Sequence, residues 1–342
     1  MKKLILSIFV SLILLGNSFA ADATLTSSGD VWAWVSASND TSGTTSTSSI
    51  KNNTYAFYGL EVAKPYGDYL TKSVLSFEGS DAAVKLYQLY VSLESKSLTY
   101  KLGYFDPSDV TQGMAYLPFW GSEFYTGVLV AQESLFSVAL NKVGLEVVAG
   151  QTEVVHTSDV DTTNDSKSVE RSVVGVYYRK ETESMSIGLA YVDVNHSINS
   201  KKGPSVTALA YGSYASQNIT AGMNYIMGPL SIAVNIEQLT ETVSSTTIPT
   251  STSVKINFSS DYTFTERSGL TFARSQTTVS DGTSSPTNKE RIELGFARDF
   301  DGLQTGVALF TSSNKDQDLQ TATNEKLSDS SQGLVVGFYM GF

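Results

Sequence analysis

Cysteine is absent from the 342-residue sequence, and histidine occurs only twice. Without cysteine no disulfide framework supports the fold, so a packed core or a hydrogen-bonded sheet must hold the chain together. His156 and His196 both lie in expected loops, so a Ser-His catalytic arrangement would have to be built outside the strands. Clusters of basic residues of the kind that bind nucleic acid are also missing. We therefore expect neither an enzyme nor a nucleic-acid-binding protein, and no cofactor.

A complete metal-binding motif is lacking as well. Residues 159–165, Asp-Val-Asp-Thr-Thr-Asn-Asp, resemble half of a calcium loop. The glycine and the distal glutamate of the twelve-residue pattern are not there. We interpret this stretch as a solvated acidic loop, and we expect no metal site.

Long apolar runs are missing after residue 20. Residues 4–15 are apolar but too short to span a bilayer; Lys2 and Lys3 precede them, and small residues up to Ala20 follow. This pattern is typical of a cleaved signal peptide over residues 1–20, which leaves residues 21–342 as one domain. Because no later run approaches the roughly 18 residues of a membrane-spanning helix, a membrane location would require the chain to cross as strands.

Acidic side chains outnumber basic ones. Removing Lys2 and Lys3 leaves 21 basic and 34 acidic side chains, a formal charge of −13. Mean hydropathy is −0.06, and the chain has 18 Tyr and 16 Phe. These values agree with strands that face lipid on one side and water on the other, because the two faces cancel in the average.

Apolar and polar residues alternate along most of the chain from Val31 onward. At the end, Leu334, Val336, Phe338 and Phe342 fall on one face of an extended strand. A strand with such a stripe invites aggregation when its edge is unpaired, and closing the sheet removes the edge. The pattern therefore predicts an all-β fold, a closed antiparallel transmembrane barrel.

Short and long connections alternate between the expected strands. The short ones are 64–68, 94–97, 141–144, 181–183, 228–229, 265–268 and 299–302, and the long ones, rich in Ser, Thr, Asn and Asp, are 38–53, 106–133, 155–168, 195–204, 240–252, 280–288 and 313–332. Counting every apolar segment gives eighteen strands and forces the loop 155–168 onto the short-turn rim. Placing 124–130 inside the preceding loop, and treating 206–226 as one long strand, gives sixteen strands with all long loops on one rim. We favour sixteen strands and keep eighteen as the alternative.

These features together resemble the general porins of Gram-negative outer membranes. The resemblance is carried by the signal peptide, the alternating strands, the long third loop, the terminal Phe342 and residues 260–272, Ser-Asp-Tyr-Thr-Phe-Thr-Glu-Arg-Ser-Gly-Leu-Thr-Phe. It implies a sixteen-stranded, trimeric, water-filled channel in the outer membrane, whose third loop folds inward to narrow the pore. It also implies that the outer-membrane assembly machinery recognises the terminal strand through Phe338 and Phe342.

The third loop departs from the enterobacterial pattern. The motif Pro-Glu-Phe-Gly-Gly-Asp is replaced by residues 106–113, Asp-Pro-Ser-Asp-Val-Thr-Gln-Gly. We expect Asp106, Asp109, Tyr116 and Glu123 to line the constriction, since loop bulk would set the pore size and loop charge its selectivity. The alternative is a loop that lies over the mouth and covers it.

Six basic residues fall on strand faces opposite the apolar stripe, and therefore toward the lumen if the stripe meets lipid. They are Lys72, Lys101, Arg171, Arg179, Lys255 and Arg291. A charge facing lipid at mid-depth costs about 2–4 kcal/mol, so a barrel requires this placement. Opposite an acidic loop, such a wall would orient dipolar solutes, whereas the simpler alternative is that these charges keep the pore wet. The acidic chain suggests a mild cation preference.

Passive diffusion of small hydrophilic solutes and ions is the function that the resemblance implies. The alternatives are a substrate-selective channel, and a barrel that acts mainly as an adhesin or an envelope structural protein. The expected partners are outer-membrane lipid, lipopolysaccharide, the barrel assembly machinery, two further copies of this chain and the solutes themselves.

Overall fold

In the computed structural model the structure describes residues 23–42, 45–80, 83–105, 133–157, 166–201, 214–243, 250–280, 286–320 and 326–341. Within these ranges there is no helix long and apolar enough to cross a membrane. They form sixteen strands: β1 (Thr24–Ser42), β2 (Thr45–Tyr66), β3 (Tyr69–Ser80), β4 (Ala83–Glu94), β5 (Leu98–Phe105), β6 (Glu133–Leu140), β7 (Leu145–Thr157), β8 (Ser166–Glu181), β9 (Met185–Lys201), β10 (Tyr214–Met227), β11 (Leu230–Val243), β12 (Ser251–Thr265), β13 (Ser268–Ser280), β14 (Thr287–Phe300), β15 (Leu303–Gln320) and β16 (Lys326–Gly341).

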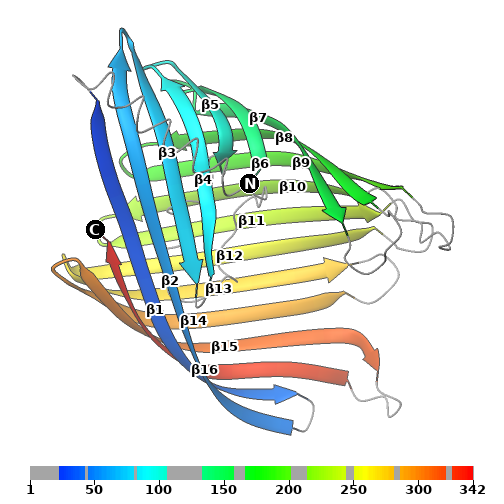
Figure 1. The fold of residues 1–342 in the computed structure, drawn as a ribbon. Coiled ribbons are helices and arrows are strands. Elements are labelled where there is room, and N and C mark those ends of the chain that lie inside the picture. The colour runs from blue at the N-terminus through cyan, green and yellow to red at the C-terminus, as the bar shows by residue number, and fades with distance from the viewer. Residues whose placement is uncertain are drawn as a thin grey trace.

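The strands form one closed antiparallel barrel, in which each strand pairs with its neighbours in sequence and β1 pairs with β16 (Figure 1). The ring closes from Asp30 opposite Gly341 to Ser42 opposite Asp329. The expected all-β barrel of sixteen strands is confirmed, and the alternative of eighteen is wrong. The segment 206–226, expected to be one long strand, contains the start of β10 at Tyr214; residues 206–213 and 124–130 lie outside the described residues.

Several segments expected to be loops are paired strand. Residues 38–53 belong to β1 and β2, which stay paired as far as Ser42 opposite Thr45. Hydroxyl contacts cross this hairpin, between Ser38 and Ser49 at 3.0 Å and between Thr41 and Ser46 at 3.2 Å. Strands β8 and β9 likewise continue to Ser166 and Lys201. A composition rich in hydroxyl side chains therefore marks strand extensions here, because these side chains also suit a hydrated strand surface.

The strands are joined by tight turns at one rim of the barrel, which we call the short-turn rim. We call the opposite rim the long-loop rim. Between β14 and β15, Phe300 is opposite Leu303 and only Asp301 and Gly302 connect them. Both have positive φ, 55° and 98°. A two-residue hairpin of this kind requires positive φ at both positions, which Asp-Gly adopts at low cost. The short-turn rim is therefore fixed by local turn chemistry.

Alternation sorts the side chains onto two faces of the barrel wall. On β13, Leu270 and Phe272 are exposed at 44% and 38%, whereas Thr271 and Ala273 between them are 4% and 0% exposed. Exposed aliphatic and aromatic residues recur at alternate positions on β14 to β16, including Leu294, Leu309 and Val336. The outer face is therefore apolar, and the chemistry of the barrel lies on the inner face.

Candidate functional site

One sector of the inner wall is apolar and buried. Its residues come from β5 to β9 and form a single cluster: Phe105, Leu135, Val148, Val173, Tyr177, Ala190, Val192 and Val194. Tyr90 of β4 packs against this cluster, with its ring 5.5 Å from that of Phe105. Phe105 pairs with Glu133, so the two ends of the segment 106–132 meet at this apolar sector. The third loop therefore begins and returns beside an apolar surface that faces the barrel interior.

The opposite sector of the inner wall is polar, and its residues lie in rows that cross neighbouring strands. The first row consists of register partners on consecutive strands from β11 to β1: Asn235, Asn257, Ser275, Arg291, Ser312, Ser331 and Asp40. The second row lies beside it from β11 to β16: Glu237, Lys255, Thr277, Lys289, Asn314 and Asp329. Neighbouring members of a row are one strand spacing apart, about 4.7–4.9 Å.

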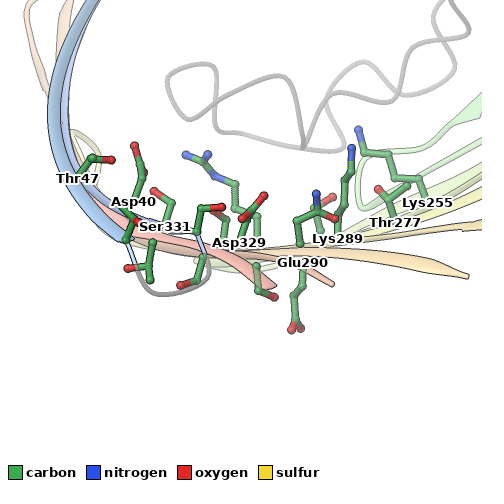
Figure 2. A pocket seen from close by; sticks show the side chains of 17 residues that line it. Asp40, Thr47, Lys255, Thr277, Lys289, Glu290, Asp329 and Ser331 are labelled. Carbon is green, nitrogen blue, oxygen red and sulfur yellow. The ribbon is translucent and has the colours of Figure 1, made fainter. Parts of the chain in front are cut away.

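The parts of the two rows that run from β12 to β1 line a cavity of about 760 Å³ near the long-loop rim, with Lys255, Arg291 and Lys289 as its basic residues. Lys255 and Lys289 lie on one flank of this wall cavity, and Asp40 and Asp329 lie on the other (Figure 2). These four side chains project to the same side of the wall, whereas Glu290 projects to the opposite side. The space between the flanks is lined mainly by hydroxyl and amide side chains such as those of Thr277 and Asn314. The cavity is therefore polar throughout and carries opposite charges at its two ends.

Three of the predicted basic wall residues lie within three positions of a strand end at the short-turn rim, each beside a carboxylate. Lys72 is 3.1 Å from Glu94 and 3.8 Å from Glu61, whereas Lys101 is 3.8 Å from Glu146. Arg179 is paired with Glu181 two residues further along β8. Pairs of this kind contribute little stability when solvated, about 0–1 kcal/mol, but they cancel much of the local field. The short-turn rim therefore carries mixed charge rather than a basic wall.

The other predicted wall residues lie elsewhere on the ring. Lys255 and Arg291 belong to the wall cavity, where Arg291 donates to Glu293 at 2.5 Å and stacks over the Phe310 ring at 4.4 Å. Arg171 is on β8 in register with Thr152 and His196, and its side chain lies outside the described residues. The six basic residues are therefore spread around the barrel: Lys255 and Arg291 line one cavity, and Lys72 and Lys101 are both register partners of Ser92 on the strand between them.

The predicted constriction residues Asp106, Asp109, Tyr116 and Glu123 lie outside the described residues, as does Phe342. Phe338, the other predicted assembly residue, is on β16 between Ala33 of β1 and Thr305 of β15. Its ring is 47% exposed on the outer face. The constriction and the assembly signal therefore remain predictions from the sequence.

Lys255 and Arg291 of the wall cavity were predicted from the sequence to face the lumen, but Lys289, Asp40 and Asp329 were not. Lys289 is two positions from Arg291, so the strand period of two was a signal that could have placed both on one face. Asp40 and Asp329 were hidden because both lie in segments expected to be loops, 38–53 and 313–332. No cluster of three or more His, Asp or Glu that could hold a metal occurs among the residues that the structure describes.

A closed barrel with an apolar outer face and a polar sector inside is the architecture of a membrane-spanning β-barrel. The fold matches the anion-selective porin from Comamonas acidovorans with a TM-score of 0.68 at 14% identity, covering 94% of this chain and 100% of that one. It also matches OmpT of Vibrio cholerae, an outer-membrane protein, with a TM-score of 0.64 at 10% identity over 94% and 99% of the two chains. OmpF of Salmonella typhi, in complex with daunomycin, matches with a TM-score of 0.60 at 12% identity over 93% and 97%.

No family model matches the sequence, and no curated protein does so. At such low identities the structural matches establish the fold, which is that of the outer-membrane porins.

Proposed function

We propose that this protein is an outer-membrane porin of a Gram-negative bacterium, a water-filled channel for passive diffusion of small hydrophilic solutes and ions. The observation that carries the proposal is the sorting of side chains in a closed ring of sixteen strands. Leu294 and Leu309 face outward and are 54% and 62% exposed, whereas the opposite face carries the charged and hydroxyl residues of the two rows. Such a wall is stable with lipid outside and water inside, and it needs no energy source to conduct.

The third loop narrows this channel in our proposal. The segment 106–132 has 27 residues, and both its ends lie at the apolar inner sector beside Phe105. Val148 and Val173 in that sector are 0% and 1% exposed although they face the interior, which supports a chain segment packed over them. Aromatic residues such as Tyr116 would pack against this surface. Asp106, Asp109 and Glu123 would then add negative charge to the narrowest part of the pore.

The proposed assembly is a homotrimer in contact with outer-membrane lipid and lipopolysaccharide. A trimer form of Vibrio cholerae OmpT shares the fold, with a TM-score of 0.62 at 8% identity, which supports this assembly. Phe338 and Phe342 would be recognised by the machinery that inserts barrels into the outer membrane. Passive diffusion through such a channel involves no chemical step and requires no catalytic residue.

Conductance of the purified protein in planar lipid bilayers tests the channel. We expect stepwise, ohmic current increments of constant size, because a fixed wet lumen conducts ions in proportion to voltage. Entry of small neutral sugars into protein-containing liposomes, measured by swelling, gives a second readout of the same pore. A folded barrel that inserts but neither conducts nor admits sugars would instead favour the role of an adhesin or envelope structural protein.

A further inference from the structure

The wall cavity has an acidic and a basic end that are held at a fixed separation. On the second row, Lys289, Asn314 and Asp329 are register partners on three consecutive strands. Two strand spacings place the backbones of Lys289 and Asp329 about 9–10 Å apart. This separation is slightly longer than the Debye length at physiological ionic strength, about 8 Å, so salt weakens the field between the ends but does not remove it. The sheet therefore maintains a persistent dipole along the cavity.

The charges at the two ends do not cancel each other. Lys289 and Asp329 make no ion pair among the residues that the structure describes. Asp40 instead accepts hydrogen bonds from the hydroxyls of Ser38 and Ser49, at 3.3 and 3.4 Å. These donors are neutral, and Lys51 compensates the charge of this carboxylate only in small part, because its coulombic effect is weaker than that of the hydroxyl groups. A solute in the cavity therefore meets both charges.

The dimensions of the cavity suit a small solute. Its volume of about 760 Å³ falls within the usual range for ligand pockets, roughly 300–1,000 Å³. Three extended residues of a peptide span about 10 Å, which matches the separation of Lys289 and Asp329. Side chains such as Asn314 and Thr277, which line the space between the charges, can donate to and accept from peptide groups.

We propose that the wall cavity is a binding site for zwitterionic solutes, specifically short peptides whose terminal ammonium and carboxylate are about 10 Å apart. The carboxylate binds at Lys289 and Lys255, and the ammonium binds at Asp329 and Asp40. A simple anion gains the lysines but is repelled by the aspartates, and a simple cation meets the reverse. The proposal rests on the channel function proposed above, which it deepens by naming the solute class that the wall favours.

Inhibition of the ion current by three tripeptides tests this site. Triglycine is the zwitterion, acetylated triglycine the anion and triglycine amide the cation, and all three are similar in length. In the native channel we expect triglycine to reduce the current at about fivefold lower concentration than either analogue. The attraction between two unit charges 4 Å apart in water is about 1 kcal/mol, which corresponds to about a fivefold difference in affinity. Lys289→Gln and Asp329→Asn should each reduce the difference, and exchange of all four charges, Lys255→Asp and Lys289→Asp with Asp40→Lys and Asp329→Lys, should restore it.

Glu290→Gln is the matched control, because Glu290 borders the cavity beside Lys289 on β14 but its carboxylate projects to the other side of the wall (Figure 2), where it lies 2.7 Å from Arg274. It should leave the order of the three tripeptides unchanged. The inference is overturned if native protein conducts and admits neutral sugars but inhibition is equal for all three tripeptides. It is also overturned if Glu290→Gln has the same effect as Lys289→Gln. Absence of both conduction and sugar entry would refute the channel function, and this inference with it.

Discussion

Leu309 on β15 provides a direct test of whether the outer stripe of apolar residues faces lipid. Its side chain is 62% exposed, and its register partners Leu294 and Leu334 are apolar and exposed too. Leu309 lies six residues beyond Leu303, which begins β15 at the short-turn rim. Six residues rise about 20 Å along a strand, or about 15 Å along the barrel axis at a tilt of 35–45°. Leu309 therefore lies well away from the short-turn rim and inside the apolar band, although it pairs through Leu294 with Phe272, the last large apolar residue of the outward stripe on β13.

Leu309→Arg should lower the free energy of unfolding by about 2 kcal/mol, because a guanidinium facing lipid costs about 2–4 kcal/mol at the bilayer midplane and less toward the interfaces. Leu303→Arg is the matched control, because Leu303 is the same residue type on the same strand and the same face. At the rim the same change should cost only about 0–1 kcal/mol. The comparison cancels any general effect of adding arginine to this strand.

The measurement is reversible urea unfolding of protein folded into lipid vesicles, followed by tryptophan fluorescence, with free energies from linear extrapolation. Equal destabilisation by the two variants would show that depth does not matter. That result would refute the assignment of this face to lipid. An unchanged slope of free energy against urea concentration is required for the comparison, because a changed slope reports altered compactness.

Three further changes test other parts of the barrel. Arg291→Leu removes an ion-pair partner of Glu293, which is 1% exposed, and should lower the free energy of unfolding in urea by about 3–5 kcal/mol. Adding Glu293→Gln should recover most of this loss. No recovery would mean that lost packing of the Arg291 side chain, rather than an uncompensated charge, causes the destabilisation. Asp106→Asn with Asp109→Asn should lower cation over anion permeability, because negative charge leaves the proposed constriction; an unchanged reversal potential in a salt gradient would count against that position of the loop. Deleting Phe342 should reduce the amount of folded protein in outer membranes but leave the unit conductance of inserted channels unaltered, and normal insertion would contradict its role in assembly.

The period of two in the sequence determined which face each strand residue takes. Leu334 and Val336 were placed on one stripe by alternation, and both are exposed in the barrel. The wall cavity was beyond this reasoning, because Asp40 meets Ser331 through pairing of the first and last strands. Such long-range register depends on every turn in between, and no local pattern encodes it. Composition was also a poor guide to secondary structure here. The hydroxyl-rich segments around Asp40 and Asp329 were expected to be loops but are paired strands.

The position at which charged residues replace apolar ones on the outer face indicates the level of the wall cavity relative to the membrane. On β13, Phe272 is the last large apolar residue of the outward stripe, and the next outward position is Arg274. Arg274 pairs with Glu290 of β14 at 2.7 Å, on the outer face of the wall. A charged pair is tolerated outside the hydrocarbon but is costly within it, so the upper edge of the band lies between Phe272 and Arg274. Lys289 immediately precedes Glu290, and strand alternation turns its side chain inward at the same level. The wall cavity therefore lies above the hydrocarbon, and in the proposed channel it would act on solutes that enter from the long-loop rim before they reach the proposed constriction.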